Sequence, residues 1–130
     1  MQKFILDRWA PQLLSLLRIV VGFLYLCHGS AKLLGYPPGM EGIHLMSLMG
    51  LAGVLELVGG ALVCVGLFTK PAAFILSGEM AVAYFMVHAS GGFLPFVNHG
   101  EAAVFYCFAF LYLSAAGPGP IALDAMMRKR

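Results

Sequence analysis

Four long apolar runs, separated from one another by breaks rich in glycine and proline, constrain this chain more than any other feature. They cover residues 11–34, 48–69, 71–89 and 101–116, and most approach the ~20 residues that a helix needs to cross a bilayer. The composition agrees: 61% of the residues are hydrophobic, only 11% are charged, and the mean hydropathy is +0.89, far from the balance of a water-soluble domain. The sequence therefore predicts an all-α, polytopic membrane four-helix bundle that forms a single domain over residues 1–130.

The basic residues predict how this bundle lies in the membrane. With four spans, six of the eight Lys and Arg side chains fall on one side. Cytoplasmic loops are enriched in these residues, so both termini are expected to be cytoplasmic, in a multi-pass protein of the bacterial inner membrane. The net charge of +2 is too small to indicate a nucleic-acid partner. The six basic residues are Lys3, Arg8, Lys70, Arg128, Lys129 and Arg130.

The first run also has features of a cleavable signal peptide, since Lys3 and Arg8 precede it and small residues follow it. Arg18 argues against cleavage, because the apolar region of a signal peptide does not normally carry an arginine. Three further apolar runs follow as well. We therefore expect a retained first helix.

The three cysteines point away from redox and metal chemistry. Cys27, Cys64 and Cys107 each lie singly inside an apolar run. They form neither a CxxC pair nor a cluster with the spacing of metal ligands, so buried thiols are expected and no metal site is predicted.

Three ionisable residues are predicted to lie deep in the hydrocarbon. At 1.5 Å per residue, Arg18 lies ~10 Å and Glu79 about 12 Å from the cytoplasmic side, while Glu56 lies ~12 Å below the outer surface. An unpaired charge at such depth costs a few kcal/mol or more. Arg18 is therefore expected to form a buried ion pair with Glu56 or Glu79, and a purely structural role explains that pair as well as a functional one does.

Helical spacing collects small and polar residues on shared faces. In the second run, Gly53, Glu56 and Gly60 share one face, which suits close packing around a buried carboxylate. In the third run, His88 lies nearly opposite Glu79 on an ideal helix, so either His88 makes a different contact or the helix is irregular. The stripe on the first run contains Arg18, Gly22, Tyr25, Gly29 and Lys32, with His28 at its edge.

A second polar group is predicted at the outer face, where it forms a candidate pocket. Its members also have ordinary explanations, since Lys32 can snorkel and His28 can be an interfacial helix-end residue. Asn98 and Glu101 fit the N-cap and N3 positions of the last helix. In the same way, Thr69 is placed to cap the third helix. The candidate pocket residues are His28, Lys32, Glu56, His88, Asn98 and Glu101, and His44 and His99 fall on the same side.

The order and spacing of the motifs resemble those of the DoxX family of small bacterial membrane proteins. The segment RIVVGFLYLCHGSAKLLG is similar to the family's first-helix signature, an Arg followed by a Gly, a His-Gly pair and a Lys. The segment LELVGGALVCVGLFTKPAA resembles its Glu-x-x-Gly-Gly helix, and FLPFVNHGEAAVFYCFAFLYLSAAGPGP resembles its fourth-helix region. The likeness extends over residues 11–125, and in the tail Ile121-Ala122-Leu123-Asp124 stands where a Trp-Ser-Leu-Asp pattern is expected.

The resemblance implies a four-helix inner-membrane protein. Its relatives are described as small subunits of a thiosulfate:quinone oxidoreductase, as membrane partners in redox-stress complexes, or as helpers in the biogenesis of other proteins. A shared family does not by itself determine activity. By this resemblance, the residues of interest are Arg18, His28, Lys32, Glu56, His88, Asn98 and Glu101.

Three functions stay open at this point. The first is an accessory subunit of a redox system, in which an outward pocket binds a quinone head group or a small sulfur anion. There His28 and Lys32 supply donors and positive charge, and Glu56 relays a proton. Electron transfer then needs a bound quinone or a partner subunit, because the sequence offers no flavin fold, haem ligand pair or redox dithiol. The alternative is a non-catalytic scaffold or assembly factor for partner proteins. Both the redox subunit and the scaffold are compatible with a homo-oligomer. The third function, a proton-coupled carrier, fits four short unbroken helices poorly.

Overall fold

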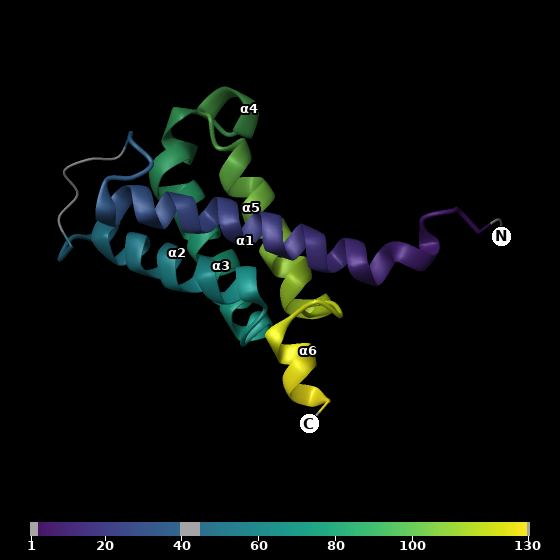
Figure 1. The fold of residues 1–130 in the computed structure, drawn as a ribbon. Helices are drawn as coiled ribbons and strands as arrows, with labels where there is room; N and C mark the ends of the chain where they lie inside the picture. The colour runs from purple at the N-terminus through teal and green to yellow at the C-terminus, as the bar shows by residue number, and fades with distance from the viewer. Residues whose placement is uncertain (1–2, 40–44, 130) are drawn as a thin grey trace.

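The computed structural model describes residues 3–39 and 45–129, and within these ranges every regular element is a helix (Figure 1). The predicted all-α class is thus confirmed for the described part of the chain. His44 and Arg130 lie outside it. The elements are η1 (Asp7–Trp9), α1 (Ala10–Leu34), α2 (Leu48–Val65), α3 (Thr69–Ala83), η2 (Tyr84–His88), η3 (Ala89–Gly91), α4 (Pro95–Asn98), α5 (Glu101–Ala116) and α6 (Leu123–Arg128).

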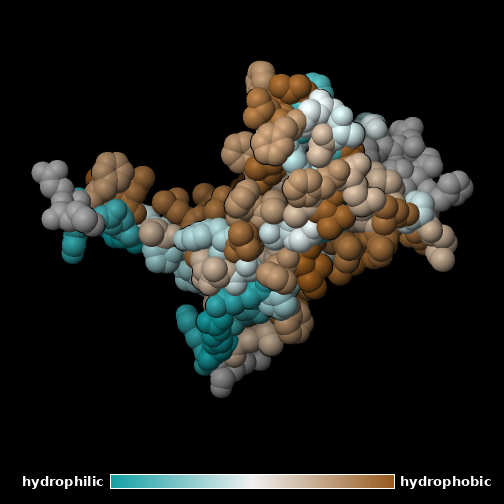
Figure 2. Space-filling view, turned by 180° about the vertical axis from the view of Figure 1, so that it is seen from behind, coloured by the Kyte–Doolittle hydropathy of each residue, from teal (hydrophilic) through white to brown (hydrophobic). Residues whose placement is uncertain are grey.

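Three helical segments of the described chain are long and apolar enough to cross a membrane: Asp7–Leu34, Leu48–Val65 and Thr69–Gly91. The fourth predicted span, α5, has 16 residues and rises about 24 Å, which is less than the ~30 Å of a hydrocarbon core. Figure 2 shows a mostly apolar face, with hydrophilic residues gathered on the N-terminal arm and around α6. An apolar exterior of this kind belongs in lipid rather than in water, so the chain is a membrane protein.

Glycines bring α1 and α2 into close contact along their length, where the two helices run side by side (Figure 1). A Cβ atom added at Gly22 would lie 2.6 Å from the backbone nitrogen of Cys64, and one at Gly60 would lie 2.7 Å from that of Leu26. A Cβ at Gly29 would meet the α2 backbone as well. Only glycine permits this approach, which is the small-residue packing typical of membrane helices.

The second closely packed pair is α3 with α5. Its buried side chains include Leu76 from α3 and Phe110 and Leu113 from α5. Tyr25 of α1 joins this core, with its ring centroid 4.8 Å from that of Phe110. Contacts between α2 and α3 are sparser, and those between α1 and α5 are fewer still, so the bundle consists of two helix pairs joined by a looser junction.

The segment after α5 folds back against α1 and supplies the hydrogen-bond partners of the Arg18 side chain. The guanidinium donates one hydrogen bond of 2.7 Å to the carbonyl oxygen of Pro118 and one of 2.6 Å to that of Ile121. Ser15 supports the same segment, because its hydroxyl oxygen accepts a 3.0 Å hydrogen bond from the Ile121 N–H. Arg18 is only 1% exposed, so these carbonyls replace water around a buried cation.

This arrangement corrects the predicted ion pair of Arg18 with Glu56 or Glu79. Arg18 is buried as expected, but its partners are backbone carbonyls about 100 residues further along the chain. The two carboxylates have other partners. The helical stripe correctly placed Arg18 inside the bundle, whereas nothing in its spacing indicated that the last segment of the chain would return to cover it.

The start of α3 is capped from a distance by Asp124 of α6. The Phe68 N–H donates to Oδ1 of Asp124 at 2.9 Å and the Thr69 N–H donates to Oδ2 at 3.0 Å, while the Asp124 N–H donates to the Gly66 carbonyl at 2.8 Å. The prediction that Thr69 is the cap is wrong, since Thr69 is the first helical residue. Partial burial acts to raise the pKa of Asp124, but the amide hydrogen bonds and the charge of Arg128 outweigh it and hold the pKa below its ordinary value.

Replacing Asp124 with Ala is expected to lower the free energy of unfolding by about 1–2 kcal/mol, because two amides of the first turn of α3 lose their acceptor. The contribution of Asp124 is present above the ordinary aspartate pKa and is lost as the pH falls through the lowered folded-state pKa. Denaturation in detergent micelles at neutral and acid pH, followed by circular dichroism, measures both effects. The control is Asp7→Ala, which removes a similar bond to the Phe4 amide on the exposed N-terminal arm; equal losses in the two variants would contradict the long-range cap.

Candidate functional site

A cavity of about 610 Å³ lies between the two helix pairs. Most of its wall is apolar and comes from the N-terminal half of α2, from α3 and η2, and from the start of α5. A volume of this size is typical of sites that bind small molecules. The polar residues on its wall are Tyr25, His28, Lys32, Glu56, Glu79, His88 and Tyr106.

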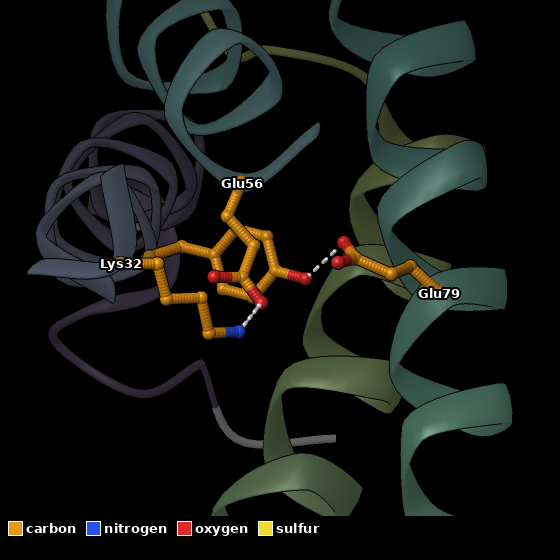
Figure 3. A network of polar contacts seen from close by, with 4 residues as sticks. Lys32, Glu56 and Glu79 are labelled. Atoms are coloured by element: carbon orange, nitrogen blue, oxygen red, sulfur yellow. Dashed lines mark hydrogen bonds and ion pairs between the residues drawn. The ribbon is translucent and has the colours of Figure 1, made fainter. Parts of the chain in front are cut away.

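Lys32 and Glu56 form a buried ion pair at one end of the cavity (Figure 3). Nζ of Lys32 lies 2.6 Å from Oε1 of Glu56, and the two side chains are only 10% and 2% exposed. Lys32 therefore turns inward from the C-terminal part of α1 and does not snorkel to the surface. The sequence placed Lys32 on the small, polar stripe of α1 and Glu56 on the glycine-lined face of α2. It predicted Arg18 as the partner of the buried carboxylate, however, and the packing of α1 against α2 pairs Glu56 with Lys32 instead.

Tyr25 and Glu79 form a second polar contact beside the ion pair. The Tyr25 hydroxyl donates a 2.5 Å hydrogen bond to Oε2 of Glu79, and Figure 3 shows the Glu79 side chain pointing from α3 toward this group. Tyr25 is 1% exposed. Sequence reasoning did not include Tyr25 among the site residues, although its place on the same stripe as Lys32 was the signal that could have indicated it.

The two carboxylates are only half satisfied by these contacts. Oε2 of Glu56 and Oε1 of Glu79 are buried and have no hydrogen-bond partner among the described residues. Lys32 and Glu56 both act electrostatically on Glu79, and the Glu56 and Glu79 carboxyl groups lie close enough to share a proton. Buried polar atoms without partners are uncommon in folded proteins and indicate a place where a ligand, a water or a proton belongs.

His28 lines the cavity through contacts between rings. Its centroid lies 5.7 Å from that of Tyr106, edge to face, and 6.5 Å from that of Tyr25. The residue as a whole is exposed, so His28 lies at the margin of the cavity and not at its buried end. Its place one turn before Lys32 on α1 accounts for this position.

An irregular turn brings His88 to the same cavity as Glu79. Residues Tyr84–His88 form η2, a π-helical turn in which the Ala89 N–H bonds back to the Tyr84 carbonyl. A π turn holds more residues than an α turn, so residues beyond it rotate relative to an ideal helix. This resolves the alternative left by the sequence: the helix is irregular, and both residues line the cavity although ideal spacing sets them on opposite faces.

Asn98 and Glu101 lie apart from the cavity wall. Asn98 is buried and holds the loop before α5, where its side-chain amide donates to the Gly92 carbonyl at 2.8 Å and its oxygen accepts from the Gly100 N–H at 2.9 Å. Glu101 is exposed at the first position of α5. The predicted capping pair is wrong, because Gly100 occupies the N-cap position without a side-chain cap. Asn98 touches the site only indirectly, through its carbonyl oxygen 3.2 Å from Nδ1 of His88.

Comparison with known proteins identifies the family. The sequence profile of the DoxX family matches residues 13–89, which include most of α1, all of α2 and α3, and most of the polar residues on the cavity wall. The chain belongs to the DoxX family. A protein of Haemophilus influenzae that bears the name "Uncharacterized protein" is 44% identical over 96% of this chain and 98% of its own length.

A second relative carries a functional name. The Bacillus subtilis (strain 168) protein named "Putative oxidoreductase CatD" is 29% identical over 88% of this chain and 86% of its own length. No solved structure matches the chain significantly. Within the described part of this DoxX protein, no three His, Cys, Asp or Glu side chains gather as a metal site, and Cys27, Cys64 and Cys107 are free and half-buried.

Removing Lys32 from this DoxX protein is expected to strand the carboxylate of Glu56. Lys32→Met should lower the free energy of unfolding by about 3–5 kcal/mol, because breaking one half of a buried pair leaves an uncompensated charge. The double variant Lys32→Met, Glu56→Gln should recover most of that loss. Unfolding in mixed micelles measures the cycle, with the exposed Lys70→Met as the control. Equal stability of Lys32→Met and Lys70→Met would show that Glu56 does not depend on Lys32.

Proposed function

We propose that this DoxX protein is an accessory subunit of a redox system in the bacterial inner membrane, and that its cavity binds a quinone-type head group. The observation that carries the proposal is the joining of an apolar cavity to a buried polar cluster of Lys32, Glu56, Tyr25 and Glu79. Apolar walls with a few convergent polar groups are the usual form of a small-molecule site. The oxidoreductase name of the Bacillus subtilis relative supports a redox setting.

The cluster suits proton exchange inside the membrane. Interconversion of a quinone and its reduced form moves protons together with electrons, and only an ionisable group can hold a proton at this depth. Glu56 is committed to Lys32, whereas Glu79 has no cation at hydrogen-bonding distance in the described structure. We therefore assign proton exchange to Glu79 instead of Glu56, with Lys32 and Tyr25 orienting the two carboxylates. Electrons would pass to or from a partner subunit.

We further propose four spans, with α5 as the fourth, and both termini in the cytoplasm. Lys70 and Arg128 line one pocket at the junction of α3 and α6, so basic residues far apart in the sequence meet at one end of the bundle. Loops rich in such residues remain in the cytoplasm. On this topology the Lys32–Glu56 pair and its cavity lie in the outer half of the membrane.

A reporter fused after the last residue tests this topology. Green fluorescent protein at this position should fluoresce, since it folds in the cytoplasm, and alkaline phosphatase at the same position should be inactive. The same two reporters fused to a chain truncated in the loop between α1 and α2 should give the reverse result. An active phosphatase after the last residue would place the cavity on the other side of the membrane.

Purification from native membranes tests the proposed function. The wild-type protein should co-purify with a membrane quinone and with a redox partner, both identified by mass spectrometry. Glu79→Gln should lower the quinone-dependent activity of that complex by about 100-fold or more, in the range that a lost acid–base group produces. The control is Glu101→Gln, at an exposed position away from the cavity. Co-purifying proteins without a quinone, together with full activity of Glu79→Gln, would instead favour the scaffold alternative.

A further inference from the structure

We propose that the ligand enters the cavity sideways from the lipid, between α2 and α3, and binds by donating a hydroxyl hydrogen bond to Glu56. The occupant is then a membrane-dissolved amphiphile with a hydroxylated aromatic head group, as in a hydroquinone. This inference rests on the proposed function and adds the route of entry and the form of the ligand that is bound. It also excludes a small water-soluble anion as the ligand of the cavity.

The margin of the cavity faces the lipid along α2 and α3. Leu51 of α2 and Ile75 and Val82 of α3 line the cavity and are each more than half exposed. Contacts across the junction of the two pairs, α2 with α3 and α1 with α5, are sparser than those within each pair, and the exposed apolar lining lies on the α2–α3 side of this junction. Because these exposed side chains are apolar, the opening between the helices admits an acyl or isoprenoid chain and disfavours a hydrated ion.

Gly78 leaves a gap in this wall. Glycines at close helix contacts in this protein, such as Gly22 and Gly60, have backbone atoms where a Cβ would lie. Gly78 differs, because a Cβ added there would meet nothing within 4 Å, and it lines the cavity between Ile75 and Val82. Glycine inside a helix is destabilising relative to alanine, and no packing contact among the described residues requires it here. Its place in the cavity wall is consistent with space kept open for a ligand.

The polar end of the cavity offers acceptors. One oxygen of each carboxylate already accepts a hydrogen bond, from Lys32 in Glu56 and from Tyr25 in Glu79. The remaining oxygens, Oε2 of Glu56 and Oε1 of Glu79, are buried and have no partner among the described residues. Oε2 belongs to the carboxylate that is paired with Lys32, and a carboxylate oxygen can only accept a hydrogen bond, so a ligand group that meets it donates. The hydroxyls of a hydroquinone donate hydrogen bonds, whereas quinone carbonyls only accept them.

Charge and shape favour the same ligand. A sulfur oxyanion would meet an ammonium group that is already paired with Glu56, so its own charge would go uncompensated in a medium of low dielectric constant. The rings of Tyr25, His28 and Tyr106 lie close together on the wall. Aromatic rings pack well against a flat aromatic head group, either stacked or edge to face. A neutral hydroxylated ring therefore satisfies both the charge and the surface of this site.

Binding to the full-length protein in lipid nanodiscs tests both parts of the inference. Decylubiquinol, decylubiquinone and thiosulfate are titrated anaerobically, and bound ligand is measured by native mass spectrometry and by the shift in melting temperature. Decylubiquinol is expected to bind at least about tenfold more tightly than decylubiquinone, as unmatched hydrogen-bonding groups weaken binding. Thiosulfate should not bind detectably. Equal or tighter binding of decylubiquinone would overturn the donor assignment, and saturable thiosulfate binding in the cavity would overturn the lipid-dissolved class.

Closing the opening tests the route of entry. Gly78→Phe should weaken decylubiquinol binding by about tenfold or more because the added ring fills the gap, while Gly78→Ala should bind like the wild type. The control is Val58→Phe, which adds a similar ring at an exposed position of α2 away from the cavity. If Gly78→Phe does not fold, Val82→Trp blocks the same margin from a neighbouring turn of α3. Wild-type binding by a folded Gly78→Phe or Val82→Trp would overturn entry between α2 and α3.

These outcomes are distinct from a failure of the proposed function. If a quinone and a redox partner co-purify but Gly78→Phe binds decylubiquinol normally, the redox proposal stands and the lateral entrance is wrong. If no redox partner is found but decylubiquinol binds in a Gly78-dependent way, the lipid-dissolved ligand stands and the accessory redox role is wrong.

Discussion

The cost of leaving a charged or polar group without a partner in a hydrocarbon medium organises this protein. Two backbone carbonyls accept hydrogen bonds from the buried Arg18, and Glu56 forms an ion pair with the buried Lys32. Each solution needs a second segment of chain at a defined distance, so these buried groups hold the last segment against α1 and hold α1 against α2. Because such groups are costly when unpaired, they restrict the ways in which otherwise uniform apolar helices can pack.

The helices pack as two pairs, each held together by a different kind of contact. Glycines let α1 and α2 approach until their backbones touch, and this closeness brings the Lys32 ammonium within 2.6 Å of Glu56. Larger side chains join α3 to α5. The two pairs meet around Tyr25, and the space that remains between them is the cavity. A tight pair beside a loose junction thus produces a site between the two pairs, and the π turn at η2 brings His88 to its wall.

The residues that stabilise the bundle also leave hydrogen-bonding atoms available in the cavity. Lys32 and Tyr25 each engage one oxygen of a carboxylate, and the opposite oxygen stays free. A scaffold needs only the paired atoms, whereas a binding site needs the free ones as well. This difference is why the unpartnered oxygens, and not the ion pair itself, carry the argument for a ligand in this DoxX protein.

The sequence by itself determined the membrane environment, the approximate bounds of the long helices, the DoxX family, and the inward placement of Arg18, Lys32 and Glu56, because apolar run length and helical spacing are local properties. Only the tertiary structure decided which atoms those side chains meet. The return of the last segment to Arg18, the capping of α3 by Asp124 and the pairing of Tyr25 with Glu79 join residues about 50 to 100 positions apart. Spacing along one helix determines which face a residue occupies, but the element that covers this face depends on how the whole chain packs, and the π turn at η2 shows that even the face can change when the helix departs from regularity.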